Sequence, residues 1–192
     1  MTQKTSSATL DLMRSRRSVG PAFLQGPAPT PDEITQLLTL AARVPDHGKL
    51  APWRFILFEG NAQLKAGEII KSVYLADNPE ASAERLALES KRLAHAPLVI
   101  AIVSRAAPHV KIPEWEQLMS AGAVAMNLTI AVKAMGYSSA WLTEWVAYDR
   151  RVLTRLGLEA HEKITGFIHI GHATIVPDDR VRPVLSDLIT QF

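Results

Sequence analysis

The chain has 192 residues, of which 47% are hydrophobic, so it can bury a substantial core and has the size of one domain spanning residues 1–192. Its 21 lysines and arginines against 19 acidic residues leave a formal charge of +2, too small to indicate nucleic acid or a membrane surface as a partner. The absence of cysteine excludes disulfides, thiolate nucleophiles and cysteine-ligated metal centres.

The N-terminal residues 1–8 are polar and lack the apolar stretch of a secretory signal. No window of the sequence reaches the roughly 18 consecutive apolar residues of a membrane span. We therefore expect a soluble, cytoplasmic protein that does not use a membrane as a partner.

The hydrophobic pattern and the helix start and stop signals predict the secondary structure. Thr30-Pro31-Asp32-Glu33 is a strong helix start, because it combines a capping box with proline at the first helical position. Pro45 cannot continue that helix, so residues 43–51 should form a loop, which is a suitable place for a site. We expect helices at residues 9–17, from 31 onward, and at 62–74, 80–94, 114–135 and 149–156, and strands at 53–58, 98–103, 138–142 and 164–170.

Two segments suggest how these elements are layered. Residues 98–103 form a continuous apolar run that is typical of a central strand. From Leu118 the helix 114–135 is apolar or small on almost every face, which predicts a buried central helix closed by Gly136. The tail 173–192 has no partner of its own. The predicted fold class is α+β, a mixed β-sheet covered by helices on both faces.

Several common motifs are missing from the sequence. The phosphate-binding patterns G-x-x-x-x-G-K-[ST] and G-x-G-x-x-G and the nucleophile pattern G-x-S-x-G do not occur. His169 and His172 have ligand-like spacing, but a step of three along a strand points two side chains to different faces. We therefore predict no metal site.

A basic cluster follows the first predicted helix. Arg14-Ser15-Arg16-Arg17-Ser18 concentrates three guanidinium groups and two hydroxyls, and arginine offers paired planar donors to a phosphate. Composition alone favours a solvated helix end, because charge runs usually face water. A third possibility is that these arginines contact nucleic acid, but the near-neutral total charge and the few aromatic residues argue against it.

The basic cluster is the first of several motifs whose order along the chain is informative. It is followed at helix-plus-loop distance by Ala42-Arg43-Val44-Pro45-Asp46-His47 and Ala51-Pro52-Trp53-Arg54-Phe55, and later by Trp115-Glu116-Gln117-Leu118-Met119-Ser120-Ala121-Gly122-Ala123 and Trp141-Leu142-Thr143. In this combination the chain, from about Thr9 to its C-terminus, resembles the FMN-dependent nitroreductase family.

Two departures from the wider family narrow the resemblance. Asp46-His47-Gly48 stands where many members have a Ser-Ser pair, and this favours the small YdjA-like subgroup. Trp141-Leu142-Thr143 stands where close relatives often place an arginine. The second departure bears on substrate preference, not on flavin binding.

The resemblance implies a nitroreductase-like fold whose C-terminal tail extends onto a partner, in a homodimer with FMN sites shared between subunits. One subunit supplies Arg16, Arg17 and Ser18, and the other supplies Arg43 and His47. Without the resemblance, His47 would be a loop histidine that satisfies backbone groups. Trp141, Leu142 and Thr143 are implied to meet the flavin ring system.

Two further segments carry weaker implications. Arg180 and Arg182 stand where the wider family often places a basic residue on the phosphate, and the alternative is that they are exposed to solvent. The resemblance also suggests that a second segment lies near the bound nicotinamide nucleotide. The alternative is that this segment is only the buried end of a helix. This segment consists of Ala131, Val132, Lys133, Ala134, Met135 and Gly136.

The implied activity is an FMN-dependent NAD(P)H oxidoreductase. Electrons would pass by a ping-pong mechanism to a small electron-poor acceptor such as a nitroaromatic or a quinone. Because FMN would supply the chemistry, no side-chain acid or base is required, and no catalytic residue is predicted. The alternative is a protein of the same fold that binds or handles FMN without general reductase turnover.

Overall fold

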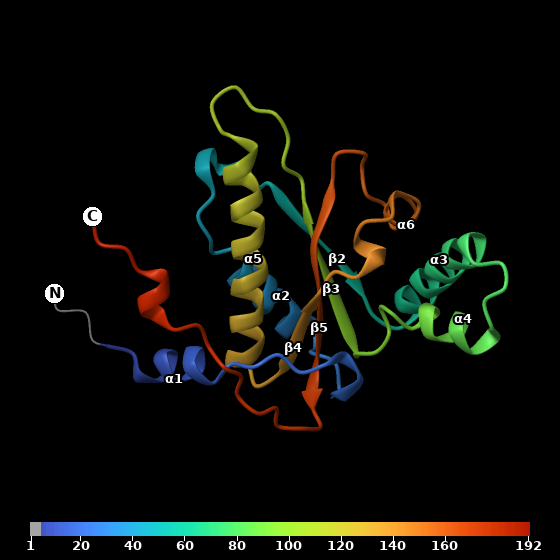
Figure 1. The fold of residues 1–192 in the computed structure, drawn as a ribbon, viewed down its shortest axis with the longest axis horizontal. Helices are drawn as coiled ribbons and strands as arrows, with labels where there is room; N and C mark the ends of the chain where they lie inside the picture. Colours follow the sequence, from blue (N-terminus) through green and yellow to red (C-terminus); the bar gives the residue numbers. More distant parts are fainter. Residues whose placement is uncertain (1–4) are drawn as a thin grey trace.

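The protein was analysed as a computed structural model that describes residues 5–192; residues 1–4, part of the polar N-terminal segment, lie outside the described residues (Figure 1). The helices are α1 (Ser7–Ser15), α2 (Pro31–Ala41), α3 (Asn61–Asp77), α4 (Ala83–Ser90), α5 (Glu114–Ala134) and α6 (Arg150–Arg155), and the strands are β1 (Leu24–Gln25), β2 (Trp53–Phe58), β3 (Leu98–Ser104), β4 (Ser138–Leu142) and β5 (Lys163–Ala173). None of the helices in the described part of the chain is both long and apolar enough to cross a membrane.

Strand β3 lies between two cores because successive residues of a strand point to opposite faces of the sheet. Helices α2 and α5 cover one face, and α3 and α6 cover the other (Figure 1). Leu98, Ile100 and Ile102 join the first core, and Val99, Ala101 and Val103 join the second. The predicted α+β fold with helices on both faces of the sheet is confirmed.

Strand β5 organises the sheet by pairing along both of its edges. It pairs with β3, which in turn pairs with β2, and it pairs separately with β4 and with the short β1. All four of these pairings are antiparallel, whereas the sequence analysis predicted a mixture of directions. An apolar strand has the same pattern in either direction, so hydrophobic periodicity does not determine strand direction.

Some element boundaries differ from the predicted ones. Helix α1 ends at Ser15, so Arg16 and Arg17 lie in extended backbone after the helix. The predicted helix 80–94 is helical only from Ala83 to Ser90, because the side chain of Ser82 caps it by accepting from the Arg85 N–H. Strand β1 was not predicted; it has two residues and forms only through pairing with distant β5.

Helix α5 is buried on one side within this chain. Val124 and Leu128 pack into the core beneath the sheet and are fully buried. On the outward side Leu118, Met119 and Met126 are exposed. The prediction that every face would be buried is therefore met only on the sheet side, and an apolar surface stays uncovered on the other side.

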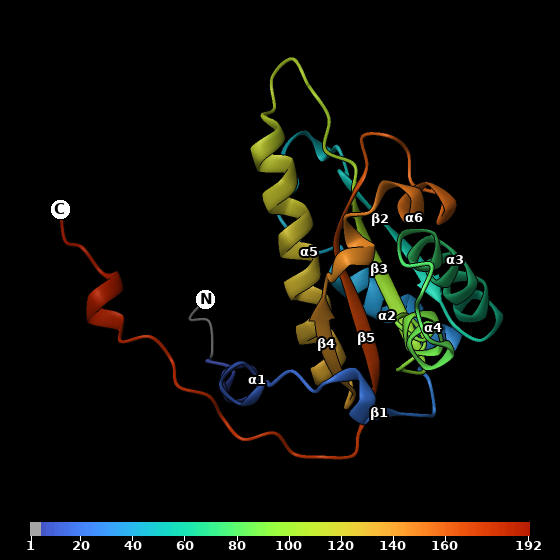
Figure 2. The same cartoon turned by 45° about the vertical axis from the view of Figure 1, so that its right-hand side comes forward.

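The C-terminal tail runs from the end of β5 past α1, and its end lies apart from the sheet in both views (Figure 1, Figure 2). It is tied to the body near its start, where the Thr174 N–H donates to the Phe23 carbonyl oxygen at 2.9 Å. Further along, Val181, Leu185 and Leu188 are exposed. The tail thus carries apolar side chains that this chain does not cover.

A buried ion pair connects β2 to the loop before β5. Arg54 donates from Nε and Nη2 to the two carboxylate oxygens of Glu162, each at 2.7 Å, and the Glu162 side chain is only 2% exposed. The Arg54 guanidinium lowers the pKa of Glu162 from 4.5 to about 2. Because the folded-state pKa is the lower one, this pair stabilises the fold above pH 4.5, and the stabilisation is lost as the pH falls toward 2.

We expect Arg54→Met to lower the free energy of unfolding at pH 7 by about 3 kcal/mol, because it leaves a buried carboxylate with the Glu159 N–H and, as its cation, only the more distant Arg105 at 3.6 Å. Urea denaturation measures the change. Lys71→Met is the matched control, since it removes the exposed Lys71–Glu68 pair and should cost less than about 1 kcal/mol. Equal losses for the two variants would contradict this account.

Candidate functional site

The predicted loop 43–51 is fastened to one polar stripe of α5. Glu116, Ser120 and Asn127 are spaced by four and seven residues, so they lie on the same side of the helix. Asn127 Nδ2 donates to the Arg43 carbonyl oxygen at 3.1 Å, and Ser120 Oγ donates to the Pro45 carbonyl oxygen at 2.7 Å. Helix α5 therefore determines where the loop backbone lies.

The third residue of the stripe orients His47. Its Nδ1 lies 2.6 Å from Glu116 Oε2, so Nε2 is the ring nitrogen available to another partner. This side-chain contact differs from the backbone contacts expected of an ordinary loop histidine. His47 and Glu116 line a cavity of about 410 Å³ whose other walls include Pro45, Trp115 and Met119.

The loop backbone is strained, and Asp46 holds it. Lys49 and Ala51 have φ values of 56° and 44°, in the left-handed region that non-glycine residues rarely adopt. The Asp46 carboxylate accepts from the Leu50 N–H at 3.0 Å and the Ala51 N–H at 2.9 Å. Gly48, at φ 70°, takes the position where a side chain would be unfavourable. The Asp46-His47-Gly48 string thus keeps His47 in one place.

The basic segment after α1 lies against β4. The Val19 N–H donates to the Ser139 carbonyl oxygen at 3.0 Å, which fixes the direction of Arg16, Arg17 and exposed Ser18 along the strand. This contact brings the basic cluster beside the strand that ends in the predicted Trp141-Leu142-Thr143 string. The two motifs are 123 residues apart when counted from Ser18 to Trp141.

Two arginines converge on one carboxylate oxygen beside this segment. Arg17 Nη1 and Arg182 Nη2 donate to Asp179 Oδ1 at 2.9 and 3.0 Å. The pKa of Asp179 is lowered by the backbone N–H of Arg180 and then by these two guanidinium groups. Asp179 thus shows that the tail arginine and the basic cluster can hold the same anion.

The basic residues line two cavities. Arg16 and Arg182 line one of about 560 Å³, together with Met126 and Ile130 of α5. A second cavity, of about 150 Å³, is lined by Arg17, Lys133 and Ser138, the first residue of β4. The two cavities are linked through Asp179, which lines the first and accepts from Arg17 of the second.

The other end of β4 is shaped by an irregularity in β5. The register with β3 shifts between Ile102 and Val103, so Thr165 is left without a paired residue. Trp141 Nε1 donates to the free Thr165 carbonyl oxygen at 3.2 Å. The indole lies over Gly166, where an added Cβ would come within 2.0 Å of Trp141 Nε1. The bulge and the glycine therefore set the position of the Trp141 ring.

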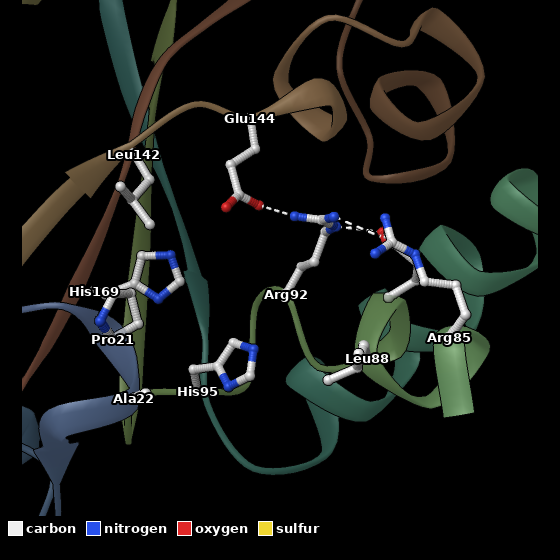
Figure 3. A pocket seen from close by; sticks show the side chains of 10 residues that line it. Pro21, Ala22, Arg85, Leu88, Arg92, His95, Leu142, Glu144 and His169 are labelled. Atoms are coloured by element: carbon white, nitrogen blue, oxygen red, sulfur yellow. Dashed lines mark hydrogen bonds and ion pairs between the residues drawn. The ribbon is translucent and has the colours of Figure 1, made fainter. Parts of the chain in front are cut away.

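Beyond Trp141, β4 opens onto a cavity of about 350 Å³ (Figure 3). Its walls come from the segment after α1, α4 and the residues following it, the end of β4, and β5: Pro21, Ala22, Arg85, Leu88, Glu89, Arg92, His95, Leu142, Glu144 and His169. Thr143, the last residue of the predicted string, is half-buried between Leu142 and Glu144.

The charged residues of this cavity are paired with one another. Arg92 donates to both Glu89 and Glu144, and Arg85 Nη2 lies 2.8 Å from Glu89. Burial disfavours the charged form of Glu89, but hydrogen bonds from Arg92 and Trp145 outweigh it and leave its pKa below the usual range. Two arginines are thus balanced by two glutamates, and the cavity presents polar groups with little net charge.

His169 is a buried polar residue in the same wall. It is 2% exposed, and its Nδ1 has no hydrogen-bond partner among the described residues. Burial, reinforced by a Coulombic interaction with His95, lowers the pKa of His169 to about 4, so the His169 ring is neutral at pH 7. His172 lies elsewhere, exposed and 4.7 Å from the Tyr137 ring.

The structure brings together some predicted site residues and separates others. Arg16, Arg17 and Arg182 meet beside β4, whereas His47 contacts Glu116 near the start of α5. Met126, which faces Arg16, lies ten residues after Glu116, or about 15 Å along the helix. In one chain, His47 and Arg16 therefore line different cavities.

The predicted nucleotide segment divides in two. Ala131 and Val132 are buried in the core, which corresponds to the alternative of a buried helix end. Only the part from Lys133 to Gly136 reaches the surface. Gly136, at φ 84°, follows the end of the helix, as predicted. The side chains of Ala131 and Val132 are occupied by packing.

Several residues that line these cavities or hold the loop 43–51 were not predicted from the sequence. Asn127 and Ser120 could have been recognised, since they are polar residues in the part of the helix after Leu118, which is mostly apolar or small. His169 could have been recognised as well, because it interrupts an apolar strand, and buried polar residues need a reason. Arg92 and Asp179 had no signal, since each lies in an ordinary charged segment.

The chain belongs to the nitroreductase family: the model "Nitroreductase family" matches residues 13–172. Over 164 residues it is 31% identical to the Escherichia coli (strain K12) protein "Putative NAD(P)H nitroreductase YdjA", covering 84% of this chain and 86% of that protein. This finding confirms the resemblance to the YdjA-like subgroup.

Solved structures support the fold. A nitroreductase-like family protein from Bacillus cereus matches with a TM-score of 0.85 at 22% identity, covering 100% of this chain and 98% of that one. A nitroreductase-type protein from Desulfovibrio desulfuricans, solved in complex with FMN, matches with a TM-score of 0.74 at 20% identity and covers 98% of both chains.

Proposed function

We propose that this protein is an FMN-dependent NAD(P)H oxidoreductase that reduces a small electron-poor acceptor such as a nitroaromatic or a quinone. The observation that carries the proposal is the pair of cavities at the ends of β4. Ser138 lines the cavity of Arg17 and Leu142 lines the cavity of His169. Four strand steps separate them by about 13 Å, and residues four apart point to the same face.

The two ends of β4 match the two ends of FMN. The phosphate is anionic, and Arg16, Arg17 and Arg182 supply guanidinium groups, of which those of Arg17 and Arg182 already converge on the Asp179 carboxylate. The ring system is flat with an uncharged polar edge, and the cavity beside Leu142 offers balanced charges and the imidazole of His169. The residues present therefore fit this cofactor at both ends.

The comparisons support the same assignment. The relative YdjA is named for NAD(P)H and nitro-group reduction, and a structural neighbour was solved with FMN. When bound, FMN accepts hydride from a nicotinamide and passes electrons on to an acceptor. The chain's own residues anchor the phosphate and position the ring against Trp141, Leu142 and Thr143. No side chain is required as an acid or a base.

We also propose a homodimer in which each subunit offers Arg43 and His47 to the site of its partner. Within one chain His47 and Arg16 line different cavities. The exposed apolar residues of α5 and of the tail provide a surface that a second copy would cover. Obligate interfaces of this kind commonly bury on the order of 2,000 Å² or more, which the tail can reach by lying across the partner.

Arg16→Ala should weaken FMN binding about tenfold or more, because a charge-assisted hydrogen bond contributes roughly 1.5 to 3 kcal/mol. Riboflavin lacks the phosphate, so its affinity should hardly change. Quenching of flavin fluorescence measures both affinities. Arg155→Ala, on the opposite side of the molecule at Ser72, is the control and should leave both unchanged. Equal losses for FMN and riboflavin would show that Arg16 serves the fold.

Mixing two defective chains tests the shared site. Arg16→Ala and Arg43→Ala each damage every site of a homodimer, but a mixed dimer contains one site with both arginines intact. Random pairing of equal amounts should therefore restore about a quarter of all sites. FMN binding is measured after unfolding and refolding the chains together. Recovery that stays at the level of the separate variants would place Arg16 and Arg43 in the same chain's site.

Donor and acceptor should use one open face of the flavin in turn, which predicts ping-pong kinetics. Double-reciprocal plots against NAD(P)H at several acceptor concentrations should be parallel. Enzyme reduced with NAD(P)H and then freed of the nucleotide should be reoxidised by a nitroaromatic. Converging lines would mean that both substrates occupy the site together. Bound FMN without NAD(P)H oxidation would favour a flavin-handling protein instead.

A further inference from the structure

The cavity at the Leu142 end of β4 contains a feature that the phosphate-binding arginines do not explain. His169 lies on β5 between Ile168 and Ile170, both fully buried, and its Nδ1 has no partner in residues 5–192. A buried polar atom without a hydrogen bond costs free energy that an apolar side chain would avoid. The imidazole is therefore poorly suited to a purely structural role at this position.

The neighbours of His169 restrict the kind of group it can meet. Figure 3 shows the rings of His95 and His169 and the Arg92–Glu144 pair around the cavity. Because Arg85 and Arg92 are already paired with Glu89 and Glu144, the wall offers no strong attraction for an anion. A neutral imidazole has one donor and one acceptor nitrogen, which suits an uncharged edge that carries both kinds of group.

Backbone strain borders the same cavity. Glu144 directly follows the Trp141-Leu142-Thr143 string and has φ 54°, a value that a residue with a side chain rarely adopts. Its carboxylate is held by Arg92. Strain of this kind persists only where surrounding contacts enforce it, and it concentrates at functional sites. The end of β4 is thus held in a fixed conformation next to His169.

We propose that His169 is the ring-recognition residue of the site: its imidazole forms a hydrogen bond with the uncharged polar edge of the flavin ring, in the cavity bounded by Leu142, His95 and the Arg92–Glu144 pair. This inference rests on the proposed function. It divides recognition of FMN between two ends of β4, with Arg16, Arg17 and Arg182 selecting the phosphate and His169 selecting the ring.

The division predicts a distinctive pattern of affinities. His169→Leu should weaken FMN and riboflavin equally, by about tenfold, because both ligands carry the ring and would lose the same hydrogen bond. Arg16→Ala should weaken FMN alone. His169→Asn, which retains a short hydrogen-bonding side chain, should recover part of the loss. His172→Leu, the same change two residues past Ile170, should leave both affinities unchanged. A selective loss of FMN in His169→Leu would overturn the proposal.

A second measurement observes the unaltered chain directly and uses the variants only to assign its resonances. In protein labelled with ¹⁵N-histidine, adding FMN should shift the ring nitrogen resonances of His169 and leave those of His172 in place, with assignments taken from His169→Asn and His172→Leu. FMN that binds without changing the His169 resonances would overturn this inference alone. If the unaltered protein binds neither FMN nor riboflavin, the proposed function itself fails.

Discussion

Helix α5 is the element on which the rest of the structure depends, because each of its three sides has a different role. Val124 and Leu128 fill the core under the sheet. The polar stripe of Ser120 and Asn127 holds the loop that carries His47. The local sequence of the loop does not by itself fix this position. The outward apolar side, which includes Met119, is left uncovered. A single rigid helix thus relates the core, one part of the candidate site and the proposed dimer surface.

Charge is distributed unequally along β4, and this distribution gives the site a direction. At the Ser138 end, guanidinium groups gather around Asp179, an exposed carboxylate that a phosphate could replace. At the Leu142 end, arginines are balanced by buried or half-exposed glutamates, and the polar groups left over are histidine nitrogens. A molecule with one anionic end and one neutral polar end therefore fits in only one orientation.

Backbone strain is found at both loops that border the site. The turn in which Lys49 and Ala51 are left-handed is held by the Asp46 carboxylate, which accepts from the Leu50 and Ala51 N–H groups, and Glu144 is held by Arg92. In each case a charged side chain fixes a turn with left-handed residues within a few positions of a residue that we assign to the cofactor. Such residues cost free energy, so they are stable only because the packed sheet and α5 over-determine their surroundings. Rigid positioning of the ring is the expected benefit.

The sequence by itself determined most of the helices and strands and the family, because periodicity, the capping box at Thr30 and the ordered motifs are local properties of the chain. It also indicated the basic cluster and the His47 loop. Only the tertiary structure decided that all strand pairs are antiparallel, that Arg182 of the tail joins Arg16, and that His169 faces a cavity without a partner. These features depend on contacts between residues far apart in the chain, and hydrophobic pattern carries no information about which distant segments meet.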